Sequence, residues 1–186
     1  MRYMLTILLL GVWFGMATSP PAEASQHDKR LDPLFAALKG NPNPATAHDL
    51  EQQIWTIWAE PNRPAAAAPL QLGMAALASG DLPAASAAFA VVVADDPDFA
   101  EAWNQQAIVS YMRGDFTASV GQIQHVLALE PRHFGALSGL GQIYLALDNK
   151  PAALKAFEAA LAIDPALASL QNAVAELRDR IGGQRI

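Results

Sequence analysis

The feature that most constrains the fold is a block of 34 residues that occurs three times between Leu70 and Leu167. Prolines recur at this interval, at Pro97, Pro131 and Pro165, and an acidic residue precedes each of them. The same interval relates Phe89, Ile123 and Phe157; Ala85, Ser119 and Ala153; and Gly73, Ala107 and Gly141. A repeat of this length indicates stacked supersecondary units that bury their apolar faces against one another, rather than a single globular core.

Each block has the apolar spacing of two antiparallel helices. In the first block this spacing predicts helices over about 69–79 and 83–94, joined by Gly80 and Asp81. Glycine ends a helix in a left-handed conformation at little cost, and the aspartate after it can accept hydrogen bonds from the first amides of the next helix. The third block has Asp148 where the other two have glycine, followed by Asn149, and either residue tolerates this turn at some cost.

Small and large residues follow one order in all three blocks. In the second block the order is Ala100-Glu101-Ala102-Trp103, Ala107, Tyr111, Gly114-Asp115-Phe116, Ser119, Ile123, Val126-Leu127 and Glu130-Pro131. With this order the blocks resemble tetratricopeptide repeats. The resemblance implies an all-α fold, a right-handed α-solenoid of three helix-turn-helix repeats, with an N-terminal helical pair and a C-terminal capping helix.

The expected organisation follows the limits of the repeats. It comprises a signal peptide (1–24), an N-terminal helical preface and linker (25–64), the three repeats (65–167), and a capping helix with a tail (168–186). The individual repeats cover about 66–99, 100–133 and 134–167. Solenoids need a terminal helix with a polar outer side, and the last segment has apolar residues on one side and charged residues on the other.

The first 24 residues have the pattern of an export signal. Arg2 supplies the positive start, Met4 to Met16 form an apolar run, and Ala22-Glu23-Ala24 offers the small residues that a signal peptidase needs. An apolar run of this length is short for a permanent bilayer span. We therefore expect cleavage after Ala24 and a periplasmic mature protein, with an inner-membrane anchor facing the periplasm as the alternative.

Two tryptophans, Trp55 and Trp58, lie on the second helix of the preface and carry a large apolar area. One interpretation is that they cap the exposed first face of the repeat stack. The other is that they form a ridge that binds a partner. The sequence leaves both open.

Composition and motifs argue against catalysis and nucleic-acid binding. The formal net charge is −6 with no basic block, so nothing favours nucleic acid. The chain has no cysteine, its four histidines lack zinc-ligand spacing, and it has no nucleophile elbow, phosphate loop or metalloprotease helix. We expect no enzyme activity, no catalytic residue, no cofactor and no bound metal.

The resemblance also implies where a partner would bind, because the first helices of tetratricopeptide units line a concave surface that takes a peptide of another protein. Some members grip a peptide carboxylate with a basic clamp, but the matching positions here contain no lysine or arginine. We expect apolar patches with amide donors instead, unless the N-terminal helices cover part of the groove. The expected groove residues are Leu70, Met74, Leu77, Asn104, Ile108, Tyr111, Ser138, Gln142 and Leu145.

Together these features favour an exported scaffold or adaptor that binds a peptide segment or helix of an envelope protein. Membrane contact is expected only through the signal segment before cleavage. Two alternatives stay open. One is a structural protein that forms a homo-oligomer through the repeats or the Trp55 and Trp58 face. The other is a membrane-tethered assembly factor that retains its first 16 residues.

Overall fold

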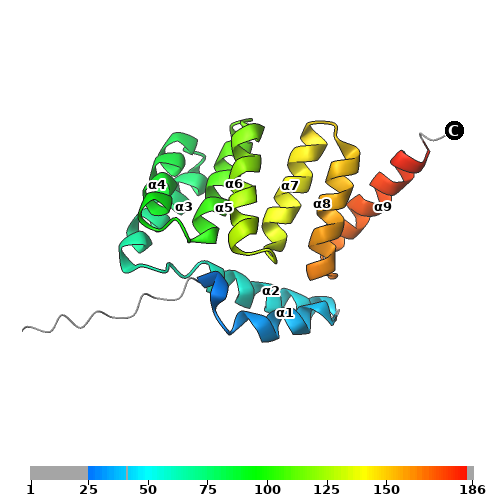
Figure 1. Cartoon of the computed structure of the whole chain (residues 1–186), viewed down its shortest axis with the longest axis horizontal. Coiled ribbons are helices and arrows are strands. Elements are labelled where there is room, and N and C mark those ends of the chain that lie inside the picture. The colour runs from blue at the N-terminus through cyan, green and yellow to red at the C-terminus, as the bar shows by residue number, and fades with distance from the viewer. Residues whose placement is uncertain (1–24, 41, 184–186) are drawn as a thin grey trace, which may run out of the picture.

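The computed structural model describes residues 25–40 and 42–183, and every regular element in this part of the chain is a helix (Figure 1). The expected signal segment, residues 1–24, lies outside the described residues. The elements are η1 (Ser25–His27), α1 (Leu31–Lys39), α2 (Pro44–Trp58), η2 (Pro64–Ala66), α3 (Ala67–Ser79), α4 (Leu82–Asp95), α5 (Ala100–Met112), α6 (Phe116–Leu129), α7 (Phe134–Ala146), α8 (Lys150–Ile163) and α9 (Ala168–Gly182). None of the described helices is both long and apolar enough to span a bilayer.

Three helix pairs form the body of the molecule. The pairs α3–α4, α5–α6 and α7–α8 stand side by side along the long axis, and α9 packs behind α8 at the far end (Figure 1). Each pair occupies one sequence block. The all-α solenoid expected from the repeats is confirmed.

The turn inside each unit follows the sequence prediction. Gly80 and Gly114 adopt left-handed conformations with φ of 79° and 75°, and Asp148 adopts one with φ of 53°. The next residue, Asp81 in the first unit, caps the following helix by accepting a hydrogen bond from the Ala84 amide at 3.0 Å. Asp115 and Asn149 do the same in the other two units.

A small residue on the first helix of each unit lets a large one on the second helix pack close to its backbone. A Cβ built on Gly73 would lie 2.5 Å from the Phe89 ring, and one built on Gly141 would clash with the edge of the Phe157 ring. Phe89 and Phe157 are fully buried. The second unit pairs Ala107 with the smaller Ile123 instead. Side-chain volume is thus matched within each unit.

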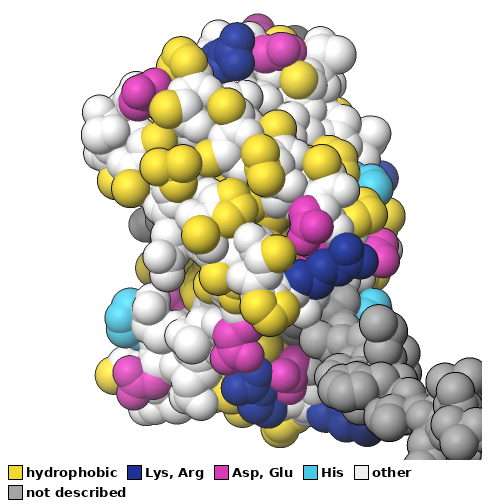
Figure 2. All heavy atoms as spheres, turned by 90° about the vertical axis from the view of Figure 1, so that its left-hand side faces the viewer, with side chains coloured by type: hydrophobic (Ala, Val, Ile, Leu, Met, Phe, Trp, Pro, Cys, Tyr) yellow, Lys and Arg dark blue, Asp and Glu magenta, His cyan; other side chains and the backbone are white. Residues whose placement is uncertain are grey.

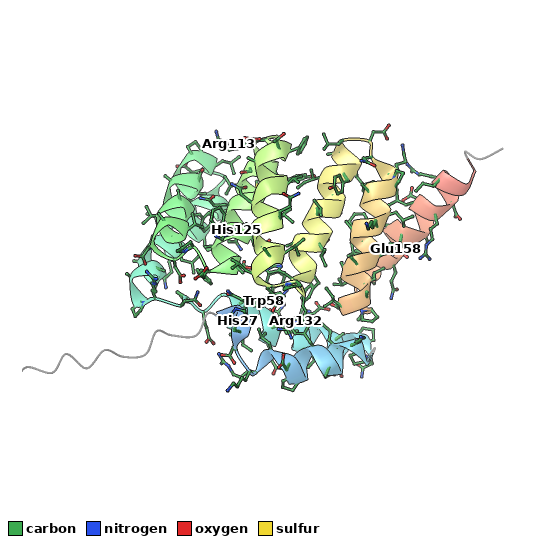
Figure 3. The ribbon with its side chains drawn as sticks, in the orientation of Figure 1. His27, Trp58, Arg113, His125, Arg132 and Glu158 are labelled. Carbon is green, nitrogen blue, oxygen red and sulfur yellow. The ribbon has the colours of Figure 1, made fainter. Side chains whose placement is uncertain are left out.

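The N-terminal preface lies across one edge of the stack rather than on its first face. Helices α1 and α2 run below the lower ends of α5 to α8 (Figure 1). In the turn between the second and third units, Arg132 bonds Asp32 of α1 at 2.8 Å, and its guanidinium lies 4.4 Å from the centre of the Phe35 ring (Figure 3). At the turn between the first two units, Gln26 donates a hydrogen bond to the Asp98 carbonyl at 2.6 Å.

The prediction that the tryptophans cap the first unit is wrong. Trp58 is 1% exposed and stacks on His133 with ring centres 4.2 Å apart, at the start of the third unit. Trp55 meets Phe134 edge-on at 5.4 Å. His133 and Phe134, at the start of α7, supply these two aromatic rings, whereas the matching positions of the first unit are Ala65 and Ala66. The aromatic surface of the preface therefore packs at the third unit. The preface and the third unit share one core cluster.

Where α2 approaches the end of the third unit, two carboxyl groups lie close together. Burial and the neighbouring charge of Asp164 raise the pKa of Glu51 above its usual range, and burial also raises the pKa of Asp164. A carboxyl whose pKa is raised by folding makes the native state bind more protons than the unfolded chain. The free energy of unfolding therefore falls as pH rises upward from the ordinary glutamate value of 4.5.

Replacement of Glu51 by glutamine is therefore expected to raise the melting temperature at pH 7, because the variant has no charge to bury beside Asp164. At pH 4 the parent glutamate is largely protonated, so the difference between variant and parent should shrink. Thermal melts at both pH values measure this. The exposed Glu176→Gln serves as the control, and an equal gain at pH 4 and pH 7 would contradict the prediction.

Candidate functional site

A pocket of about 310 Å³ opens between α5 and α7, the first helices of the second and third units. Residues from four helices line it: Trp55 of α2; Asn104, Ala107, Ile108 and Tyr111 of α5; Ser119 and Ile123 of α6; and Gly135, Ala136, Gly139, Gln142 and Ile143 of α7. None of these side chains carries a charge. The pocket therefore suits an apolar group with one or two polar neighbours.

Small residues on α7 keep the pocket open. Gly135 and Gly139 are one helical turn apart and face the same side. A Cβ on Gly139 would meet only the Ile123 side chain, at an ordinary distance of 3.6 Å, so the space beside it is free for a ligand group.

The preface supplies one wall of the pocket. A Cβ on Gly135 would lie 2.5 Å from the Trp55 ring, so the glycine is what allows the indole to lie against α7. Trp55 also meets the rings of His133 and Phe134 edge-on, at 5.4 Å each. The indole is thus held by aromatic contacts while part of it faces the pocket.

A buried polar cluster lies beneath this wall. The Glu101 carboxylate accepts hydrogen bonds from Gln105 at 2.5 Å and from Asn104 at 3.2 and 3.3 Å. His133 Nδ1 accepts from the Ala136 amide at 3.0 Å, so its proton lies on Nε2, which donates to Glu101 at 3.1 Å. All four side chains of this cluster are buried. Because the carboxylate is fully bonded, it holds Asn104 in one orientation at the pocket wall.

Four of the nine expected groove residues line the pocket together. They are Asn104, Ile108, Tyr111 and Gln142. Ile108 and Tyr111 are 38% and 39% exposed, and both come from the last turns of α5. Asn104 differs from the expectation of an available amide donor, because its amide nitrogen already donates to Glu101.

The other five expected groove residues do not line the pocket. Leu70 is buried with Phe89 in the core of the first two units, and Leu77 packs against the same cluster. Leu145 packs against the core that the preface shares with the third unit. Met74 is exposed and Ser138 is half-buried. Their part in a binding groove stays a prediction.

Several pocket residues were missing from the sequence prediction. The sequence pattern predicts Trp55 only as a cap or a ridge, and it does not predict Gly135 and Gly139 as pocket residues. Two glycines spaced one turn apart in a predicted helix are a usable signal, because they leave a hollow on one helix face. No signal in the sequence placed Trp55 beside them. Trp58 is fully buried and forms no ridge.

The described residues offer little basis for catalysis at this site. Across 25–40 and 42–183, no three His, Cys, Asp or Glu side chains gather as ligands for a metal ion. Glu101 and His133 form a buried acid–imidazole pair, but they are bonded within the wall and are not among the residues that line the pocket.

Comparison with known proteins identifies relatives along the whole chain. A family model described as tetratricopeptide repeat matches residues 70–124 and 106–168. A curated tetratricopeptide-repeat-containing protein of Rhizobium etli is 33% identical over 197 aligned positions, which cover 98% of this chain and 97% of that protein.

Solved structures share the fold at low sequence identity. A crystal structure of MamA has a TM-score of 0.60 and 20% identity, covering 80% of this chain and 84% of that one. The first repeat domain of Spaghetti (RPAP3), bound to the HSP90 peptide SRMEEVD, has a TM-score of 0.60 and 18% identity, covering 63% and 93%. The TPR2B domain of yeast Sti1, in a complex with an Hsp70 peptide, has a TM-score of 0.57 and 18% identity, covering 64% and 98%.

Proposed function

Because the chain belongs to the tetratricopeptide-repeat family, whose fold generally serves as a non-catalytic interaction module, we propose that it binds a peptide segment or helix of another protein against α5 and α7. Two of the structures that share its fold hold peptides of other proteins, which supports this class of partner. The single observation that carries the proposal for this chain is the uncharged pocket between the second and third units.

The pocket favours a partner segment with one bulky apolar side chain. Ile108, Tyr111 and Trp55 supply apolar contact, while Gln142 is exposed at the rim and can bond the partner's backbone. Burying one large apolar side chain contributes about 1.5 to 3 kcal/mol, and a residue buried in a central pocket commonly dominates an interface. No lysine or arginine lines the pocket, so recognition of a terminal carboxylate by a basic clamp is not part of the proposal.

Filling the pocket from within is expected to weaken this binding. Gly139→Leu places a side chain in the hollow without displacing the backbone, because only the end of Ile123 lies near the new Cβ. The expected loss of affinity is about tenfold or more, which is the loss of one apolar anchor. The test selects peptides from a displayed random library on the full chain, and then measures their dissociation constants by fluorescence anisotropy.

Gly121→Leu is the matched control, since Gly121 is also a helical glycine and has nothing within 4 Å of a built Cβ. It lies on α6 outside the pocket, so binding should be unchanged. Selected peptides should share a bulky apolar residue. Failure to enrich any peptide, or equal binding by the Gly139→Leu chain, would overturn the proposal.

We also propose that the protein acts outside the cytoplasmic membrane, as a scaffold for an envelope protein. The support is the signal pattern of residues 1–24. Mass spectrometry of the native N-terminus tests it: a chain that starts at Ser25 agrees with export and cleavage. A chain that starts at Met1 in the membrane fraction would favour the tethered alternative.

A further inference from the structure

The first unit leaves uncovered a face that the other two units bury. In the second unit, Ala102 and Val109 are buried in one cluster with residues of the preceding helix α4. In the third unit, Ala136 and Ile143 are buried in the same way against α6. These four residues mark the side of each unit's first helix that receives the preceding unit.

The matching positions on α3 face solvent. Shifted back by the repeat interval, they are Ala68 and Ala75, which are both exposed. Leu140 packs against the core of the second unit, but its counterpart Leu72 is 63% exposed. Because the preface lies along the lower edge of the stack, no described element covers this face of α3. Its geometry is that of a helix-docking surface.

This surface is apolar and free of charge. Between Pro64 and Ala94 the only charged residue is Asp81, which lies in the turn. Figure 2 looks onto this end of the molecule, where apolar side chains spread over α3 and α4. The opposite end is different, because α9 carries Glu176, Arg178 and Arg180 on its exposed side. Solenoids need such a polar terminal face, and the first unit lacks one.

We propose that a second copy of this chain covers the α3 face, in a head-to-head dimer. One side of α3 has an exposed stripe formed by Ala68, Leu72, Ala75 and Ser79. Their spacings of four, three and four residues are those by which two helices pair along a seam. Leu72 lies near the middle of α3, so a two-fold axis beside it brings the two Leu72 side chains together in an antiparallel pair. The alanines allow a close approach of the two backbones.

The distribution of charge favours the head-to-head dimer over head-to-tail stacking. Each chain has a formal net charge of −6, so two copies approach best through a face without charge. Head-to-tail stacking would place the charged α9 against the apolar α3, which leaves charged groups desolvated. The head-to-head contact is closed and cannot grow into a filament. This dimer does not depend on the proposed peptide pocket, which lies between other units.

The experiment measures the mass of the full chain, and of a chain beginning at Ser25, by sedimentation over a range of concentrations. A contact confined to one helix pair is small for a stable interface, so we expect a dimer that dissociates roughly in the micromolar range. Leu72→Glu should halve the sedimenting mass, because two carboxylates would meet at the axis. Leu147→Glu is the control, since Leu147 is 53% exposed but lies in the α7–α8 turn. Far-UV circular dichroism checks that each variant folds.

Mixing Leu72→Glu and Leu72→Lys chains should restore the dimer, because opposite charges then meet across the axis. If only the chain beginning at Ser25 dimerises, the proposal is supported and residues 1–24 compete for the same face. A Ser25 chain that stays monomeric at every concentration overturns it. So does a Leu72→Glu chain that still dimerises, or a mixture of the two charge variants that stays monomeric.

Discussion

Replacement of Gly141 by leucine is expected to lower the free energy of unfolding by about 1 to 3 kcal/mol or more, because the side chain overpacks a filled core. Even alanine should destabilise the chain, since its Cβ would clash with the edge of the fully buried Phe157 ring. Urea unfolding, followed by circular dichroism, measures both variants. The sign of the alanine effect is informative, because alanine normally stabilises a helix relative to glycine by about 0.5 to 1 kcal/mol.

Gly121→Ala is the matched control for this substitution. Gly121 is also helical, but a Cβ there meets nothing within 4 Å, so the ordinary helix preference should prevail and stability should rise. Opposite signs at Gly141 and Gly121 would establish that the contact with Phe157 decides the outcome. A Gly141→Ala chain as stable as its parent would contradict the packing assigned to this position.

The second unit suggests how the loss at Gly141 can be reversed. Its counterpart pair is Ala107 with Ile123, in which a larger first residue faces a smaller second one. Adding Phe157→Ile to Gly141→Ala copies this pair into the third unit. The double variant should be more stable than the sum of the two single losses implies, by about 0.5 to 3 kcal/mol in a double-mutant cycle. Strict additivity would mean that the two positions do not share one packing constraint.

The repeat interval explains why so much of the fold could be predicted. Gly80, Gly114 and Asp148 occur at equivalent turns, and all three adopt a left-handed conformation. The sequence predicted it for the two glycines and left Asp148 and Asn149 open for the third turn. The close fit of Gly141 and Phe157 likewise follows from residues that recur in register. A unit that contacts only its neighbours repeats its local chemistry, so one pattern predicts the same contact several times.

The preface could not be placed in this way, because it belongs to no repeat. Its apolar helices can pack against any uncovered apolar surface, and the sequence does not rank those surfaces. In the structure the preface packs where its tryptophans find aromatic partners, at His133 and Phe134. The pocket was predicted only in part for the same reason: Ile108 and Tyr111 follow from the repeat register, whereas Trp55 reaches the site through tertiary packing.

Replacement of Trp58 by alanine is expected to have the largest effect of any single change in the preface, a loss of about 3 to 5 kcal/mol. The indole is fully buried, stacks on His133 and packs edge-on against Trp55 at 5.3 Å. Trp103→Ala is the control, because Trp103 is only half-buried and its loss should cost much less. Urea unfolding measures both variants, and similar losses would show that Trp58 does not hold the preface.

The effect of Trp58→Ala should also reach the pocket. The Trp58 ring supports His133, which donates to Glu101, and Glu101 in turn holds Asn104 at the pocket wall. Hydrogen exchange should therefore increase in α1 and α2 and at the start of α5, while α3 and α4 keep the protection of the parent. Faster exchange in α1 and α2 alone would mean that the preface is held separately from the site. Faster exchange at α5 as well would mean that the pocket wall depends on a helix that lies outside every repeat.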